Sequence, residues 1–352
     1  MSQILIINLG STSSKVAVFN NKVCVAEELL QHDISITQLS LLEQETYRVK
    51  SIESFLYENN ISLNTINAIA CRGGLLKPIV GGTYFINQTM YNDLRTFKYG
   101  VHASNLSGVI GFKLSQKLNI PSYVVDPVVV DELMDIARIT GVKDIQRKSI
   151  FHALNQKAVA REYAQSIKKS YDQVNVIVAH MGGGITIGAH KQGKVIDVND
   201  GLLGEGPLSP ERAGNLPNDA LYHWAYQQNL TPKELNNILS KESGLIALCG
   251  SNNIKQLIQE YEKNQEIHLA IDAMIYQIAK QIGERAVSLK GSIDQIILTG
   301  GIAKSELITK KLSDYVNWIA PMTVYPGEKE MESLAIRVDD VINKKEQVKN
   351  YS

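Results

Sequence analysis

The sequence predicts an α/β protein with two similar domains that face each other across a cleft. A strand, a glycine-containing loop, a strand, a turn and a strand follow one another at residues 3–26. The same order recurs at residues 174–198, element for element. Duplication of one domain explains such a repeat most simply. The length of 352 residues also exceeds what a single hydrophobic core usually supports, so two domains are expected.

The second copy of this pattern carries three consecutive glycines, Gly182 to Gly184, directly after an apolar, β-branched run. Glycine lets the backbone turn sharply and approach a ligand closely, so the loop predicts a phosphate site. No helix follows the loop, unlike in Walker-type folds. Residues 188–194 imitate the Walker spacing, but Val195 stands where that motif needs a hydroxyl. A ligand-free hairpin is the alternative, although it usually needs only one or two glycines.

The first copy has a hydroxyl-rich loop in the corresponding place. Asn8 ends the strand, and Gly10, Ser11, Ser13 and Lys15 follow. Hydroxyls, backbone N–H groups and a cation can bind phosphoryl oxygens and, through water, Mg²⁺. Taken alone, a polar hairpin would be the simpler interpretation. The second copy of the pattern favours a phosphate loop.

Two arginines and a glycine pair are further candidates. Arg72 follows a predicted strand and precedes two glycines, where its planar fork could bind a carboxylate or phosphate. A surface salt bridge is an equally good interpretation. Arg212 lies in a Gly- and Pro-rich loop at residues 200–214, and long loops inside compact domains are often functional. Gly300 and Gly301 end a late strand and could let a purine lie against the backbone.

Composition excludes several classes of partner. The 36 basic residues balance the 36 acidic ones, so the charge favours neither nucleic acid nor an anionic membrane. No apolar run approaches the length of a membrane span, and the N-terminus resembles no signal peptide. Three separated cysteines suggest neither disulfides nor a zinc site. We therefore expect a cytoplasmic, soluble protein.

Together, four ordered motifs resemble the acetokinase family of the actin-like ATPase superfamily. They are Asn8-x-Gly10-Ser11-x-Ser13-Ser14-Lys15, Ala179-His180-Met181-Gly182-Gly183-Gly184-Ile185-Thr186-Ile187-Gly188, Ser209-Pro210-Glu211-Arg212-Ala213-Gly214 and Thr299-Gly300-Gly301-Ile302. Within the family, the chain most resembles members that act on butanoate or on branched-chain fatty acids. The resemblance implies two duplicated ribonuclease H-like domains, at residues 1–150 and 151–330, with a C-terminal helix at about 331–352 that packs back onto the first.

The resemblance also implies an activity and a set of roles. The activity is reversible, ATP-dependent phosphorylation of a short-chain carboxylic acid, butanoate, to an acyl phosphate. Arg72 and Arg212 would flank the transferred phosphoryl group, and His180 would donate a hydrogen bond to it. Nucleotide contacts would come from Asn8, Gly10, Ser11, Ser13, Lys15, Gly182, Gly183, Gly184, Gly300 and Gly301.

Mg²⁺ and the oligomeric state complete what the resemblance implies. Glu330 matches the metal-linked glutamate, with Asn8 acting through water, and Glu328 and Glu332 remain alternatives. A homo-oligomer, at least a dimer, is expected. Acetate kinases carry an Asp where this chain has Lys148. That loss is tolerable because a carboxylic acid with a pKa of about 5 is already ionised near neutral pH and needs no general base.

Three other functions stay open at the level of sequence. An acetate or propionate kinase of the same family differs only in the size of the acid. A sugar kinase of the superfamily would need a carboxylate base, for which Asp126 is the one tempting candidate; Asp before proline is also a common turn former. A nucleotide-binding scaffold or sensor would lack an acceptor. Two candidate arginines suit an anionic acceptor better than a sugar.

Overall fold

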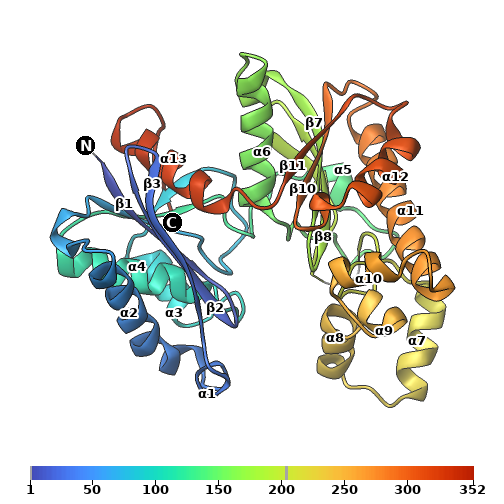
Figure 1. Ribbon diagram of the computed structural model, residues 1–352, viewed down its shortest axis with the longest axis horizontal. Helices are drawn as coiled ribbons and strands as arrows, with labels where there is room; N and C mark the ends of the chain where they lie inside the picture. Colours follow the sequence, from blue (N-terminus) through green and yellow to red (C-terminus); the bar gives the residue numbers. More distant parts are fainter. Residues whose placement is uncertain (1, 203–204) are drawn as a thin grey trace. The chain divides into compact units, whose positions relative to one another are not determined.

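The computed structural model describes residues 2–202 and 205–352 and divides the chain into two compact units (Figure 1). The first unit comprises Met1–Val130 and Lys329–Ser352, and the second comprises Asp131–Glu328. Leu203 and Gly204, part of the loop predicted at residues 200–214, lie outside the described residues.

The first unit is built on a seven-stranded sheet. In spatial order its strands are β12 (Lys349–Asn350), β5 (Thr83–Phe85), β6 (Ser122–Val125), β4 (Ala68–Cys71), β1 (Gln3–Leu9), β2 (Ser13–Asn20) and β3 (Val23–Gln31). β1, β2 and β3 form an antiparallel meander, and β4 and β6 continue the sheet parallel to β1. Its helices are α1 (Ile34–Thr37), α2 (Leu41–Glu58), α3 (Gln88–Arg95), α4 (Asn105–Leu118) and α13 (Glu330–Ile342).

The second unit repeats this arrangement in a five-stranded sheet. Its spatial order is β11 (Met322–Pro326), β10 (Gln295–Gly300), β7 (Asn175–Met181), β8 (Ile185–Lys191) and β9 (Lys194–Val198). Its helices are α5 (Asp135–Arg138), α6 (Ala153–Ser166), α7 (Asn218–Gln227), α8 (Pro232–Lys241), α9 (Leu245–Cys249), α10 (Ile254–Glu260), α11 (Gln265–Ser288) and α12 (Glu306–Val316).

The two sheets share one topology. In the second unit, β7, β8 and β9 form the antiparallel meander, and β10 and β11 extend it parallel to β7. Each meander turns through its glycine loop between the first and second strands. The predicted α/β fold with duplicated domains is therefore confirmed.

The sheet of the second unit is covered on both faces, which explains its apolar strands. Successive residues of a strand point to opposite faces. Ile177 and Ala179 of β7 accordingly pack in a cluster with α11, whereas Val176 and Val178 pack in a cluster with α6. A strand buried on both faces has a continuous apolar run instead of alternating polarity.

The chain passes between the units earlier than the sequence predicted. The sequence placed the boundary at residue 150, whereas the contacts group residues 131–150 with the second unit. Glu132 pairs with buried Lys157 of α6 at 2.9 Å, and the Met134 N–H donates to Ile196 of β9 at 2.9 Å. Contacts of this kind, made by single side chains and single backbone groups, produce no periodic pattern in the sequence, so the sequence could not predict which unit holds this segment. At the other end, α13 packs against β1 and β4 of the first unit.

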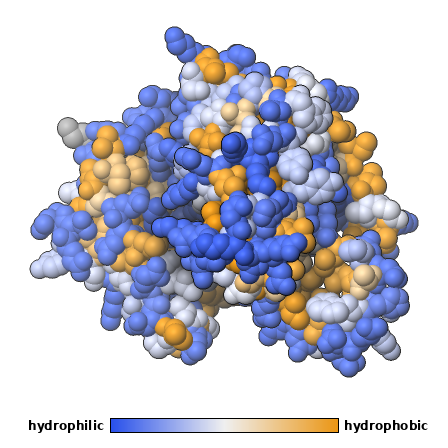
Figure 2. All heavy atoms as spheres, turned by 45° about the vertical axis from the view of Figure 1, so that its right-hand side comes forward, coloured by the Kyte–Doolittle hydropathy of each residue, from blue (hydrophilic) through white to orange (hydrophobic). Residues whose placement is uncertain are grey.

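The helical part of the second unit leaves apolar side chains at its surface. Trp224 of α7 is 40% exposed and Leu248 of α9 is 56% exposed. On the face drawn in Figure 2, hydrophobic side chains (orange) lie among mainly hydrophilic ones (blue). Among the described residues, no helix is long and apolar enough to cross a membrane.

Candidate functional site

The N-terminal loop of the first unit is a short, open turn between β1 and β2. The Gly10 N–H donates to the Ser13 carbonyl at 2.8 Å, which closes the turn. Ser11 and Thr12 at its tip are exposed. Lys15, predicted to bind phosphate, pairs with Glu27 of β3 at 2.9 Å. Its role at the nucleotide stays a prediction.

Asn8, Arg72 and Glu330 form one cluster within the first unit. They come from β1, from the end of β4 and from the first turn of α13. Asn8 Nδ2 donates to Glu330 Oε2 at 2.8 Å, and Arg72 Nη2 lies 3.5 Å from Glu330 Oε1. Arg72 Nη1 also donates to Asn8 Oδ1 at 3.4 Å. The carboxylate thus sits at the positive end of a helix and orients an arginine.

Of the three candidate glutamates, Glu330 alone belongs to this cluster. It is 5% exposed. Glu332 instead lies 3.8 Å from Lys329 at the surface. Glu328 lies in the second unit, where Oε1 is 4.0 Å from His180 Nε2.

These residues fit Mg²⁺ as part of a ligand set that water and the substrate phosphates would complete. Within the described part of the chain, no three His, Cys, Asp or Glu side chains are grouped so that they could hold a metal. Mg²⁺ in phosphotransferases is usually bound through one or two carboxylates, waters and the substrate phosphates. One buried carboxylate, Glu330, with Asn8 beside it, is a donor set of that kind.

In the second unit, the three-glycine loop and the Arg212 loop lie against each other. The Ser209 hydroxyl donates to the Gly183 carbonyl at 2.6 Å. A Cβ atom on Gly184 would overlap the Arg212 guanidinium, and one on Gly183 would lie 3.2 Å from the Glu211 carboxylate. Two motifs more than twenty residues apart are therefore one structural unit, and the glycines make room for the charged side chains.

Arg212 is partly buried beside a small cavity. A space of about 70 Å³ is lined in part by Arg212, Asp200 and Ser209. Burial lowers the pKa of the guanidinium, and the charges of Glu211 and Asp200 oppose that effect. Among the described residues, Arg212 Nε has no hydrogen-bond partner. A buried, unsatisfied donor on a cation is suited to an anionic ligand.

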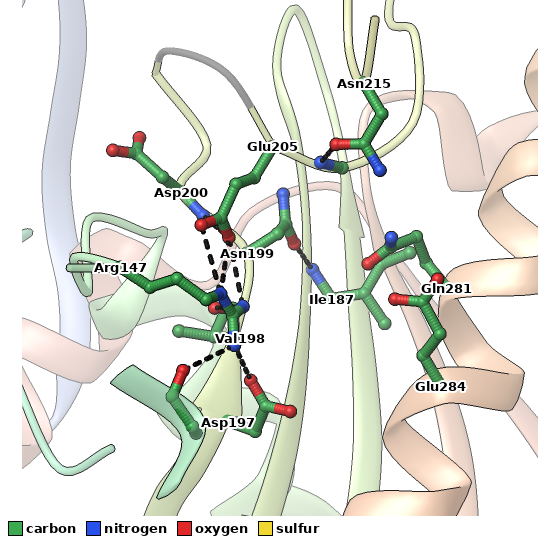
Figure 3. A network of polar contacts seen from close by, with 12 residues as sticks. Arg147, Ile187, Asp197, Val198, Asn199, Asp200, Glu205, Asn215, Gln281 and Glu284 are labelled. Atoms are coloured by element: carbon green, nitrogen blue, oxygen red, sulfur yellow. Dashed lines mark hydrogen bonds and ion pairs between the residues drawn. The ribbon is translucent and has the colours of Figure 1, made fainter. Parts of the chain in front are cut away.

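The loop that carries Arg212 is anchored by an arginine that sequence reasoning missed. Arg147 binds the Glu205 carboxylate with Nε at 3.0 Å and Nη2 at 3.0 Å, and Asp197 with Nη1 at 3.0 Å (Figure 3). At the neck of the loop, the Gly206 N–H donates to the Asn215 side chain at 2.9 Å. Arg147 precedes exposed Lys148 in an irregular segment, so no pattern marked it.

His180 is buried at the end of β7 and held in one orientation. It is 1% exposed, and its ring stacks on His152 with centroids 3.8 Å apart. Asn155 Nδ2 lies 2.8 Å from His180 Nδ1. With the amide donating to Nδ1, the ring carries its proton on Nε2. No pattern in the sequence marked Asn155, a polar residue inside a helix.

Gly300 and Gly301 differ in what they contribute. Gly300 has φ +89°, and a Cβ there would collide with the Met181 backbone, so close strand packing requires glycine. Gly301 faces open space, since a Cβ there would meet nothing within 4 Å. Only Gly301 has room for a ligand at its Cα.

Comparison with solved structures identifies the fold. Acetate kinase of Porphyromonas gingivalis matches with a TM-score of 0.80 at 18% identity, covering 97% of this chain and 100% of that chain. A propionate kinase from Francisella tularensis matches with a TM-score of 0.77 at 20% identity, covering 96% of this chain and 99% of that one. The duplicated sheets and these neighbours define an actin-like ATPase fold.

Comparison of sequences goes further. The Acetokinase family profile matches residues 133–346. A probable butyrate kinase of Enterococcus faecalis is 46% identical over 357 aligned residues, which cover 100% of this chain and 98% of that protein. The chain belongs to the acetokinase family.

Proposed function

We propose that the protein transfers the γ-phosphoryl group of ATP to butanoate, giving butanoyl phosphate and ADP in a reversible reaction. Membership of the acetokinase family makes the chain a carboxylate kinase, a phosphotransferase that uses ATP. The choice of butanoate is carried by the 46% identity, over the whole chain, to the probable butyrate kinase.

The chemistry needs charge neutralisation more than a base. A carboxylate oxygen attacks the γ-phosphorus, an O–P bond forms, and the bond from the γ-phosphorus to the bridging oxygen breaks as ADP leaves. The acid is ionised near neutral pH, so no proton has to be removed. The barrier to the reaction comes from repulsion between the carboxylate and the triphosphate, and arginines and a metal can offset this repulsion.

In the first unit, we assign Arg72 to the transferred phosphoryl group. Glu330 and Asn8 hold its guanidinium by the contacts described above, which reduces the freedom it would lose in the transition state. Glu330, with Asn8 acting through water, would hold Mg²⁺, which neutralises phosphate charge when bound. Gly10, Ser11, Ser13 and Lys15 are assigned to the nucleotide phosphates.

In the second unit, Arg212 and His180 are assigned to the same phosphoryl group. Among the described residues, Arg212 Nε is a buried donor without a hydrogen-bond acceptor, which suits it to a phosphoryl oxygen. His180 keeps its proton on Nε2 because Asn155 occupies Nδ1, so the ring can donate to an oxygen. The N–H groups of Gly182 to Gly184 are assigned to phosphate, and Gly300 and Gly301 to the adenosine side.

The position of Asp126 supports a carboxylate acceptor over a sugar. Its side chain is fully buried at 0% exposure and accepts the Gly82 N–H at 2.7 Å. The Asp126 N–H in turn donates to the Gly82 carbonyl at 3.0 Å. A buried carboxylate bound in this turn shapes the backbone, so it is a poor candidate for a base that must meet the hydroxyl of a sugar.

A hydroxamate assay with ATP and straight and branched acids of two to six carbons tests the proposal. Butanoate should give the highest kcat/KM, and each missing methylene should lower it by roughly 10- to 200-fold. A maximum at acetate or propionate would instead assign the chain to those kinases, and a maximum at a branched acid to the branched-chain type. ATP hydrolysis with no acyl phosphate from any acid would favour a nucleotide-driven scaffold.

We further propose that the protein acts in the cytoplasm as a homo-oligomer, at least a dimer. Three free cysteines, one of them exposed, suit a reducing compartment. Apolar side chains exposed on α7 and α9 are compatible with a partner surface. Light scattering of the purified protein gives its mass in solution, and a monomer would contradict the second part of this proposal.

A further inference from the structure

A fully buried arginine lies behind the N-terminal loop. Arg48 belongs to α2 and has 0% exposure. Its guanidinium donates to the Ser11 carbonyl at 3.3 Å and to the Ser13 carbonyl at 3.4 Å. It also donates to the Ser14 hydroxyl at 3.1 Å and to Gln44 Oε1 at 2.8 Å. One side chain thus binds Ser11, Ser13 and Ser14 together.

The charge of Arg48 has no counter-charge within the described residues. No carboxylate there forms an ion pair with it, and burial lowers the pKa of its guanidinium. Its ionisable neighbour is His32, which shares the Ser14 hydroxyl at 2.7 Å. Burial and then the Arg48 charge lower the pKa of His32 to about 4, against a raising effect of Asp33, so His32 is neutral at pH 7. A buried cation of this kind is costly unless an anion compensates it.

Arg48 also decides which way the loop peptides face. Because a peptide group is trans, a carbonyl that points inward leaves the next N–H pointing outward. The Ser11 carbonyl points to Arg48, so the Thr12 N–H points away from the core. The Thr12 carbonyl is fixed by the His32 N–H at 3.0 Å. No acceptor for the Thr12 N–H is found in residues 2–202 or 205–352.

We propose that Arg48 is a positioning residue for the phosphate chain of ATP. It holds the Ser11–Thr12 peptide with its N–H outward, and its uncompensated charge favours an anion on the exposed side of the loop. Outward backbone N–H groups at a turn form an anion-binding concavity. Arg48 acts from behind the loop and does not touch the nucleotide. Because the anion is taken to be ATP, this role rests on the proposed function.

Three variants of α2 test the role. Arg48→Met removes the charge and the hydrogen bonds, and Arg48→Lys keeps the charge but loses the planar fork. Ile52→Ala is the matched control, because Ile52 lies one turn further along α2 and is 1% exposed, and its loss lowers stability by reduced packing alone. The measurements are KM for ATP, KM for butanoate, and the rise in thermal midpoint caused by MgATP without acid.

Arg48→Met should raise KM for ATP roughly tenfold or more and leave KM for butanoate within about twofold. It should also abolish most of the MgATP-induced rise in midpoint, with Arg48→Lys between it and the unaltered protein. Ile52→Ala should lower the midpoint without changing either KM. If Arg48→Met behaved like Ile52→Ala, Arg48 would be purely structural. Should Arg48→Met fail to fold, Arg48→Lys is judged against Ile52→Ala by the same criterion.

The rise in thermal midpoint caused by MgATP tests the role of Arg48 separately from the proposed function. If MgATP stabilises the unaltered protein but no acid is phosphorylated, the proposed function fails. The shift measured on the Arg48 variants still decides the role of Arg48. If the unaltered protein phosphorylates butanoate and Arg48→Met keeps its KM for ATP, the function stands and the role of Arg48 is refuted.

Discussion

Gly184 leaves the space that the guanidinium of Arg212 occupies. A Cβ at Gly184 would overlap Nη1 and Cζ of Arg212, and one at Gly201 would lie 3.7 Å from Nη1. The glycine loop therefore does more than expose backbone N–H groups. It also sets the position of the arginine that we assign to the phosphoryl group.

Gly184→Ala should displace Arg212 and lower kcat by roughly 100-fold or more, because small misplacements of a positioned group carry that penalty. Steady-state kinetics with ATP and butanoate measure it. Gly283→Ala is the control, since Gly283 lies in α11 with nothing within 4 Å of an added Cβ. That change should leave kcat unaltered and stabilise the helix by about 0.5–1 kcal/mol. Equal kcat values for both variants would contradict the steric role of Gly184.

Arg212→Ala should lower kcat by roughly 10³-fold, as expected for an arginine that acts on the transition state of phosphoryl transfer. KM for ATP should change much less, because the interaction strengthens only as charge develops. Arg212→Lys should recover little, since it lacks the planar fork. Near-normal turnover in Arg212→Ala would remove this residue from the mechanism.

Arg147→Met should destabilise the protein by about 2 kcal/mol, because it leaves the carboxylates of Glu205 and Asp197 without a shared donor. Asp197 keeps its contact with Arg285, which limits the loss. Denaturant unfolding gives the free energy, and kcat should fall as well because the Arg212 loop loses its anchor. Arg138→Met is the comparison. The Arg138 carbonyl accepts the Arg147 N–H at 3.0 Å, a backbone bond that the substitution keeps, and the Arg138 side chain pairs with Asp131; this variant should leave kcat unchanged.

Glu330→Gln should raise the Mg²⁺ concentration for half-maximal activity by roughly 10- to 100-fold, the range seen when a metal-linked partner is lost. The amide keeps the size of the side chain and loses its charge. Glu332→Gln is the matched control from the same first turn of α13, where the side chain pairs only with Lys329 among the described residues. A magnesium titration of initial rates checks both, and similar curves would refute the assignment of Glu330.

Stability should fall as the pH drops from about 6.5 to about 4 because of His32. Its pKa lies at 6.5 in an ordinary environment and at about 4 here, lowered first by burial and then by the Arg48 charge. The unfolded chain therefore binds more protons in that window, and folding loses free energy as the pH falls. Above about pH 6.5 this contribution is complete. His32→Gln should flatten the pH dependence of the thermal midpoint between pH 6.5 and 4, and an unchanged slope would exclude His32 as its source.

The sequence alone determined the duplicated strand order and both glycine loops. Strands buried on both faces have continuous apolar runs, and three consecutive glycines are easily recognised in a sequence, so local patterns sufficed for β1, β2 and β7 to β9. The resemblance carried by four motifs then predicted the acetokinase family, which the comparisons confirm. The assignments of individual site residues stay predictions.

The tertiary structure decided the partners of those residues. That Glu330, and neither Glu328 nor Glu332, meets Asn8 and Arg72 depends on how α13 returns to β1 over more than 300 residues of chain. No sequence pattern predicted Arg48 or Arg147, because their roles come from burial and from contacts distant in the chain. Local composition encodes strands and turns, whereas the charge environment of a side chain exists only after packing has removed water from it.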